Sequence, residues 1–165
     1  MKKSHVILLF FAVLLANGCH KENHHHSDYC DNLITDTIGT NDSCRIYIPS
    51  AFTPNGDGFN DVYQPALFNV KSCSVVIYNE CNEVEYSEIQ PLQGWNPVDD
   101  IKYLHTYYVR IQAITNENHH IGLCGELMAL KCIPRGTDIS DFTFSDQFSS
   151  LGPEFNSNEI LPFCP

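Results

Sequence analysis

The feature that most constrains the fold is an alternation of side chains in residues 106–114, "TYYVRIQAI". A period of two is the spacing of a half-buried β-strand, because successive side chains of a strand point to opposite faces of the sheet. Tyr108, Arg110 and Gln112 line one face of this segment. We expect the opposite face to be buried in a core, and it carries Tyr107, Val109, Ile111 and Ala113.

Four further segments are rich in β-branched and aromatic residues and are bounded by turn residues, as short strands are. The turn "ECNE" joins two of them into a predicted hairpin, and "NENHH" (116–120) is a predicted turn before the last strand. Helical periodicity is absent over any long window. The sequence therefore predicts an all-β fold, a sandwich of short antiparallel strands over residues 44–132. The four segments are 45–52, 74–79, 84–89 and 125–132.

The N-terminus has the features of a secretory signal over residues 1–18. Lys2 and Lys3 precede an apolar run that ends at Leu15, and "LANGC" follows, ending at Cys19. The apolar run is shorter than the about 20 residues that span a bilayer. Small residues before a cysteine resemble the lipobox of bacterial lipoproteins, although Ala16 stands where a Leu is usual. The resemblance implies cleavage before Cys19 and its acylation; the alternative is an ordinary cleaved signal with Cys19 as a plain thiol.

The acidic balance excludes one class of partner. The formal net charge is −11, and loss of the two signal lysines leaves 7 basic residues against 20 acidic ones, a formal charge of −13. Nucleic-acid binding by phosphate neutralisation needs a basic face, so no nucleic-acid partner is expected. Solubility explains such a charge in most proteins, and attraction of divalent cations to acidic loops is the second interpretation.

The chain has 8 cysteines, and in an exported chain they predict disulfides rather than a zinc site. If Cys19 is acylated, an odd number remains. Cys73 and Cys81 bracket one predicted strand, and 124 and 132 bracket another. Neither pair can close across a straight strand, because bridged Cα atoms lie about 5.5 Å apart. We expect bridges that tie the start of the domain and the tail to the sheet, with the connectivity open. The candidates are Cys30, Cys44, Cys73, Cys81, Cys124, Cys132 and Cys164.

The two flanks of the predicted sandwich differ from it in composition. Residues 19–43 are polar and rich in His, Asn, Asp and Thr, which predicts a disordered tether. The adjacent histidines 24–26 cannot surround one ion, so a solvated linker is preferred there over a metal site. Residues 133–165 are rich in Ser, Asp and Phe without a period and predict an irregular extension. Its Phe side chains either pack on the sandwich or form a docking segment, and Cys164 favours packing.

Residues 48–65, "IPSAFTPNGDGFNDVYQP", interrupt the strand pattern. Pro54 lacks an N–H donor, Gly56 and Gly58 permit positive φ, and short polar side chains such as Asn55 and Asp57 bond to their own backbone. The first interpretation is a structural turn that leaves a strand ending near residue 52.

The same stretch also suggests a weak calcium site. Aligning Gly58 with the invariant glycine of an EF-hand loop places four oxygens at ligand positions. The first and last positions fall on Thr53 and Gln64, which are not carboxylates, so only a weak site of the extracellular type, completed by other loops, is expected. The four ligands would be Asn55, Asp57, the Phe59 carbonyl and Asp61.

The third interpretation is a resemblance. The stretch closely resembles the opening motif V/I-P-N-A-F-T-P-N-G-D-G-x-N-D-x-F of the gliding motility-associated C-terminal domain of Bacteroidetes, with Ser50 and Tyr63 as exchanges, over about sixteen positions. Fainter likeness follows at "VVIYNECNEVEYS", at "GWN" (94–96), at "HTYYVRIQAI" and at "GELMALKC". The likeness covers roughly residues 48–132, about half of the chain.

This resemblance implies an Ig-like β-sandwich that acts as a sorting signal for type IX secretion. It implies no enzyme and no cofactor. Together with the signal it leads us to expect a small exported lipoprotein of the outer membrane or cell surface. Its expected partners are the membrane, through the lipid, and secretion or cell-surface proteins.

Catalytic residues are scarce in the sequence. His119 and His120 fall in a predicted turn, no nucleophile elbow occurs, and the cysteines are better explained as bridges. Trp95 could stack on a sugar, but a lone Trp in a sandwich more often packs in the core. Two functions therefore remain: a sorting or interaction module of the cell envelope, and a calcium-supported adhesion or ligand-binding module whose loops form the site.

Overall fold

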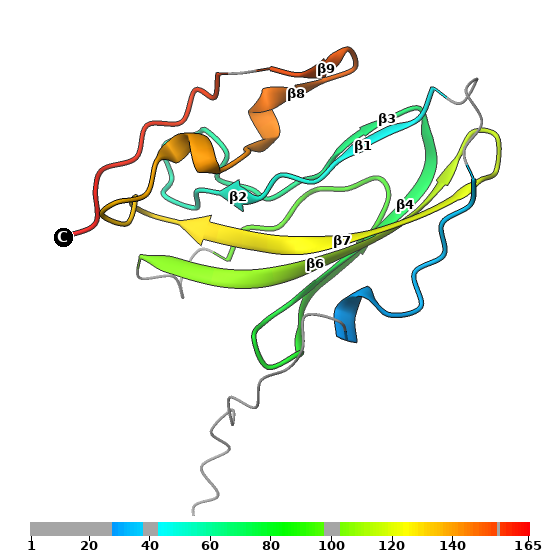
Figure 1. Cartoon of the computed structure of the whole chain (residues 1–165), viewed down its shortest axis with the longest axis horizontal. Helices are drawn as coiled ribbons and strands as arrows, with labels where there is room; N and C mark the ends of the chain where they lie inside the picture. Colours follow the sequence, from blue (N-terminus) through cyan, green and yellow to red (C-terminus); the bar gives the residue numbers. More distant parts are fainter. Residues whose placement is uncertain (1–27, 38–42, 98–102, 155) are drawn as a thin grey trace, which may run out of the picture.

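The computed structural model describes residues 28–37, 43–97, 103–154 and 156–165 (Figure 1). The predicted signal, Cys19 and most of the predicted tether lie outside these residues. Within the described part of the chain, every helix is a short 3-10 turn, and none is long and apolar enough to cross a membrane. The all-β prediction is confirmed.

The main layer is a five-stranded sheet in the order β2-β7-β6-β4-β5. The long central strands pair antiparallel, with Val109 opposite Ile77 on one side and Gly125 on the other. β5 also runs antiparallel to β4, whereas the two-residue β2 runs parallel to β7. The strands are β2 (Ala51–Phe52), β4 (Val70–Tyr78), β5 (Val84–Ile89), β6 (Leu104–Thr115) and β7 (His120–Leu130).

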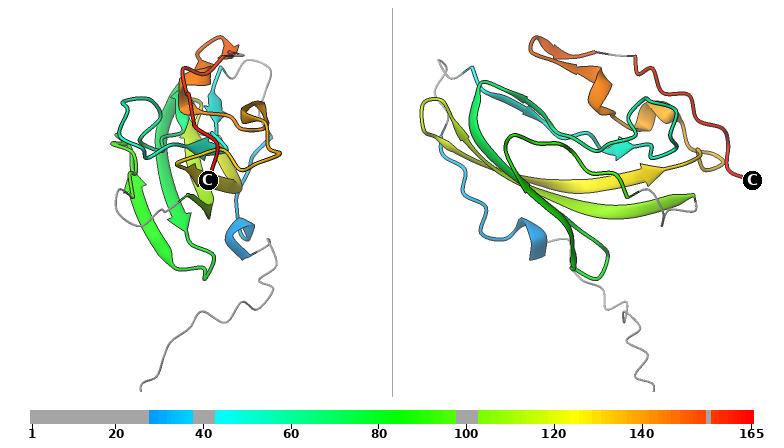
Figure 2. Two further views of the ribbon diagram at one scale, coloured as in Figure 1. Left: turned by 90° about the vertical axis from the view of Figure 1, so that its left-hand side faces the viewer. Right: turned by 180° about the vertical axis from the view of Figure 1, so that it is seen from behind.

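A second layer lies over one face of this sheet (Figures 1 and 2). It is the antiparallel pair of β1 (Arg45–Tyr47) and β3 (Ala66–Phe68), in which Ile46 lies opposite Leu67. Both of these side chains pack against the core cluster formed by β4, β6 and β7. The hydrophobic core therefore lies between two sheets, as the alternating pattern requires.

The alternation of residues 106–114 is confirmed in the structure. All four side chains assigned to the core face are buried, and the strand extends one to two residues further at each end than the pattern showed. Trp95 is also in the core, where its ring meets that of Tyr107 edge-to-face with centroids 4.7 Å apart. Core packing, rather than sugar stacking, is the role of Trp95.

The predicted strand 45–52 is two strands in different layers. β1 ends at Tyr47, and the chain then crosses to the edge of the large sheet, where β2 pairs with β7. Pro49 lies between them, and its missing N–H cannot join a ladder, which interrupts the strand. The parallel pairing of β2 differs from the antiparallel arrangement expected, because β2 enters from the other layer instead of through a hairpin.

The predicted tether over 19–43 needs a correction, because residues 28–37 belong to the fold. The 3-10 helix η1 (Asp28–Cys30) holds Tyr29, which is buried and stacks on Tyr108 with ring centroids 4.2 Å apart. The segment continues along the sheet face opposite β1 and β3 (Figure 2), where the amide of Asp36 donates to the carbonyl of His120. One buried aromatic ring, the Cys30–Cys124 disulfide, one backbone hydrogen bond and the hydrogen bonds of the Thr35 and Asp36 side chains fix a segment whose composition predicts disorder.

The extension 133–165 is irregular, as predicted, and it packs on the sandwich. Phe144 is buried in a second core cluster with Ala51 of β2 and Leu130 of β7, and Phe148 stacks on Tyr47 of β1. The amide of Ala51 donates to the carbonyl of Thr143, so the extension covers the outer edge of β2. Its elements are η2 (Ile139–Asp141), η3 (Ser145–Gln147), β8 (Phe148–Ser149) and β9 (Gly152–Pro153).

The disulfides connect the flanks to the sheet. Cys30 is bonded to Cys124 within β7, and Cys132, just after β7, is bonded to Cys164. The expected bridges from the start of the domain and from the tail to the sheet are therefore confirmed. Cys81 is disulfide-bonded as well, whereas Cys44 and Cys73 are in the thiol form.

Candidate functional site

The corner formed by residues 53–61 is organised around the carboxylate of Asp61. One oxygen accepts hydrogen bonds from the amides of Asn55 (3.1 Å) and Gly56 (2.6 Å), and the other accepts from the amide of Gly58 (2.8 Å). Gly56 and Gly58 have φ of 82° and 95°, which side chains rarely adopt, so glycine is required at both positions. The carboxylate fills a concave nest of backbone N–H groups that would otherwise attract an anion.

The predicted calcium ligands are engaged within this corner. The side-chain oxygen of Asn55 accepts from the amide of Asp57, and both oxygens of Asp57 accept from N–H groups, those of the Phe59 amide and the Asn55 side chain. The Phe59 carbonyl faces the Thr53 hydroxyl at 3.1 Å. A calcium ion would have to displace these donors. Among the described residues, no three His, Cys, Asp or Glu side chains lie close enough together to hold a metal ion. The arrangement favours the structural-turn interpretation.

The C-terminal extension docks against the back of the corner through Glu159. One carboxylate oxygen of Glu159 accepts from the hydroxyl of Thr53 at 2.6 Å and from the side-chain amide of Asn60 at 3.3 Å. Thr53 is fully buried and Glu159 is 6% exposed. The other oxygen of Glu159 is buried without a hydrogen-bond partner. A buried carboxyl with one unsatisfied oxygen is costly to ionise.

The surroundings of Glu159 change its proton affinity. Burial raises the pKa of Glu159, and the negative charges of Asp57 and Asp146 raise it further, while the hydrogen bonds from Thr53 and Asn60 lower it in part. Sequence analysis did not single out Glu159. No local pattern could have done so, because its partner Thr53 is 106 residues away in the chain.

Asp146 completes the contact between the extension and the corner. Its carboxylate accepts from the hydroxyl of Ser157 and from the amide of Asn158 (2.7 Å), which fixes the last part of the extension. The side-chain oxygen of Asn60 accepts from the Ser145 hydroxyl at 3.2 Å. The corner and the extension therefore form one hydrogen-bonded body. The outer side of the corner, from Asn55 to Phe59, remains exposed to solvent, and the Phe59 side chain is 49% exposed.

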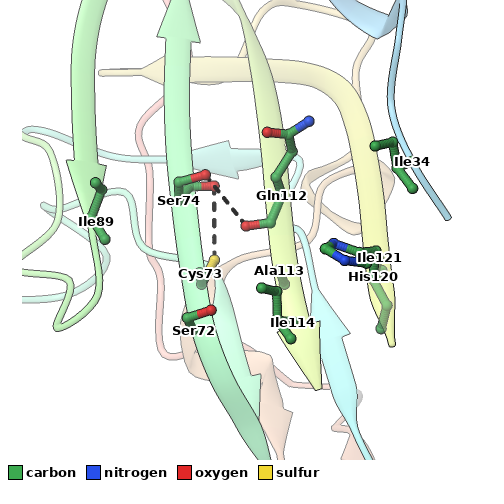
Figure 3. Close-up of a pocket in the computed structure, with 10 residues that line it drawn as sticks. All are labelled: Ile34, Ser72, Cys73, Ser74, Ile89, Gln112, Ala113, Ile114, His120 and Ile121. Atoms are coloured by element: carbon green, nitrogen blue, oxygen red, sulfur yellow. Dashed lines mark hydrogen bonds between the residues drawn. The ribbon is translucent and has the colours of Figure 1, made fainter. Parts of the chain in front are cut away.

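A second candidate site is a groove of about 350 Å³ on the sheet face opposite β1 and β3 (Figure 3). Exposed Ile34 and Ile89 flank it, and Ser74 and Gln112, which are neighbours in the β4–β6 ladder, contribute to its floor. A Cβ atom on Gly122 would lie 2.7 Å from the Cβ of Leu33, so glycine permits the close approach of the segment that carries Ile34. The remaining lining residues are Ser72, Cys73, Ala113, Ile114, His120 and Ile121.

The groove holds few groups that could perform chemistry. His120 is a titratable residue at the groove, whereas Cys73, which alternates with Ser72 and Ser74 along β4, belongs to the core cluster behind the groove floor. Burial, and then the neighbouring Cys44, raise the pKa of the Cys73 thiol to about 11, so it is protonated at neutral pH. His120 is the first residue of β7 rather than part of the preceding turn, where His119 lies. The groove can bind an apolar side chain more readily than it can activate a nucleophile.

The chain matches no protein-family model, no curated protein and no solved structure.

Proposed function

We propose that this chain is a non-enzymatic interaction module of the cell envelope, recognised by secretion or surface-display machinery through the corner at residues 53–61. The observation that carries the proposal is the conformation of the stretch that resembles the sorting family. Its Asp61 carboxylate is used internally, while the side from Asn55 to Phe59 is held rigid and exposed. A preorganised exposed loop loses little entropy on binding, which suits recognition.

Surface display of the full chain tests this proposal. The epitope-tagged protein is expressed in a bacterium that has type IX secretion, and intact cells are treated with protease. The expected result is cleavage at the surface for the natural chain and reduced surface exposure for Phe59→Ala. Leu151→Ala is the matched control, because Leu151 is 93% exposed on the extension, away from the corner. Full protection of the natural chain, or equal display of both variants, contradicts the proposal.

The proposal includes membrane attachment through a lipid on Cys19, a residue outside those that the structure describes. Acylation occupies the Cys19 thiol, so an acylated Cys19 cannot also take part in a disulfide. The expected result is incorporation of labelled palmitate that is lost in Cys19→Ala. A mapped peptide that joins Cys81 to Cys19 overturns the lipid anchor and leaves the sorting role to the display experiment.

The alternative is a calcium-supported adhesion module. The buried, unpartnered oxygen of Glu159 near Asp57 and Asp146 is the observation that favours it, because a cation would compensate their charges. Against it, the carboxylates of Asp57 and Asp61 already accept backbone N–H groups. We therefore place the sorting and interaction role first.

A further inference from the structure

We propose that Cys44 and Cys73 form an additional disulfide that joins the two layers of the sandwich. This modification site lies within the core and is independent of the proposed function. Three features of the structure favour the bond: the directions in which the two side chains point, the shape of the sandwich at this end, and the difference in exposure between the two thiols.

Both side chains point into the space between the sheets. Cys44 directly precedes β1, and it packs against the same core cluster as Ile46 and Ile48, at alternate positions along the chain. Cys73 belongs to that cluster together with Val75 and Ile77, the alternate inward positions of β4. Two thiols thus enter one apolar cluster from facing layers.

The layers are joined at this end of the sandwich. β3 runs through Asn69 into β4, and the φ of 56° at Asn69 turns the chain from one sheet into the other (Figure 1). The side-chain amide of Asn69 donates to the carbonyl and hydroxyl oxygens of Ser43, both at 3.2 Å, which holds the residue before Cys44 against this bend. Stacked sheets are about 10 Å apart, too far for a bridge, whereas at a bend the separation falls toward the 4.4–6.8 Å between bridged Cα atoms.

The two thiols differ in solvent exposure, and this difference determines which thiol reacts first with an external disulfide. Cys73 is 2% exposed, and its raised pKa makes it a poor first nucleophile, whereas Cys44 is only half-buried. The Cys44 thiolate attacks a sulfur of an external disulfide, forms a mixed disulfide and releases one thiol. The Cys73 sulfur then attacks the Cys44 sulfur and expels the second thiol, which takes the Cys73 proton. Two protein thiols are oxidised, and one external disulfide is reduced to two thiols.

The test uses the full chain with its native disulfides. Remaining thiols are alkylated under denaturing conditions before and after incubation with oxidised glutathione, and the peptides are mapped by mass. The expected result is that the labels on Cys44 and Cys73 disappear together, while one linked peptide appears. In Cys44→Ser, Cys73 should stay alkylatable and carry no glutathione, because it is buried. The Cys30–Cys124 and Cys132–Cys164 peptides report that the native disulfides have not rearranged in each sample.

Two results overturn the inference. One is full alkylation of both cysteines after oxidation. The other is a glutathione adduct that persists on Cys44 while Cys73 remains a thiol, which shows that the sulfurs cannot meet. Because both results are read on the natural sequence, they stand even if the Cys44→Ser variant fails to fold.

Discussion

The carboxylate of Asp61 should be the largest single contributor to the stability of the corner, and Asp61→Ala tests this. The substitution removes three hydrogen bonds from backbone amides, at 2.6 to 3.1 Å. Each intramolecular hydrogen bond contributes about 0.5–1.5 kcal/mol net. The three amides lie on exposed residues and can bond to water after the substitution, so the lower half of the range applies. We expect a loss of roughly 1.5–3 kcal/mol in the free energy of unfolding.

Urea unfolding followed by the fluorescence of Trp95 measures this loss. Trp95 is the only tryptophan, it is buried, and its backbone pairs with that of Tyr63, two residues after Asp61. Asp61→Asn keeps one carbonyl oxygen and should lose about half as much. Asp31→Ala removes a carboxylate from an exposed position and serves as the control, with a change within about 0.5 kcal/mol. An Asp61→Ala midpoint equal to that of the control would refute the assignment of Asp61 as the centre of the corner.

Three further predictions follow from the same geometry. Burial raises the pKa of Glu159 in the folded state. The protonated Glu159 carboxyl therefore contributes its full stabilisation at a pH below the pKa of Glu159 in the unfolded chain. This stabilisation is lost as the pH rises through the pKa of Glu159 in the folded protein. Urea midpoints of the natural chain should therefore fall across the weakly acidic range, and Glu159→Gln should flatten this part of the profile; an unchanged slope contradicts the assignment. Gly122→Ala places a Cβ atom 2.7 Å from the Cβ of Leu33, which should cost about 1–3 kcal/mol in the free energy of unfolding. It should also speed hydrogen exchange at the amides of Asp36 and His120, which join this segment to β7. Millimolar calcium should leave the melting temperature unchanged, because the oxygens of Asp57 and Asp61 accept N–H groups; a clear rise would favour the adhesion module.

The sequence predicted correctly those strands and turns that depend only on neighbouring residues in the chain. The period of two in residues 106–114 placed Tyr107, Val109, Ile111 and Ala113 in the core. In a half-buried strand, only one of the two faces can lie against the core, and the apolar face is the one that does. The glycines and short polar residues of 53–58 predicted a turn, because positive φ at Gly56 and Gly58 is a property of the backbone itself. Core packing of Trp95 was preferred because a lone Trp in a sandwich more often packs in the core, and the ring is buried there.

Contacts between distant segments could not be predicted in this way. Residues 28–37 have the composition of a linker, yet the stack of Tyr29 on Tyr108 and the bridge to Cys124 hold them on the sheet. The Thr53–Glu159 bond joins the corner to a segment 106 residues away. The length of a strand excluded a disulfide between the two cysteines at its ends. It could not identify the bonded cysteines, because the disulfide connectivity depends on how the layers are stacked.

The two bridges that end near β7 also determine how the domain bears mechanical load. Cys124 and Cys132 are the attachment points of the N-terminal segment and the C-terminal extension. Tension applied between residues 30 and 164 therefore passes through two sulfur–sulfur bonds and the short piece of chain from 124 to 132. Residues 31–123 and 133–163 lie in closed covalent loops off this path. While both bridges are intact, a pull at these two points can straighten that short piece but cannot unravel the rest of the sandwich from its ends.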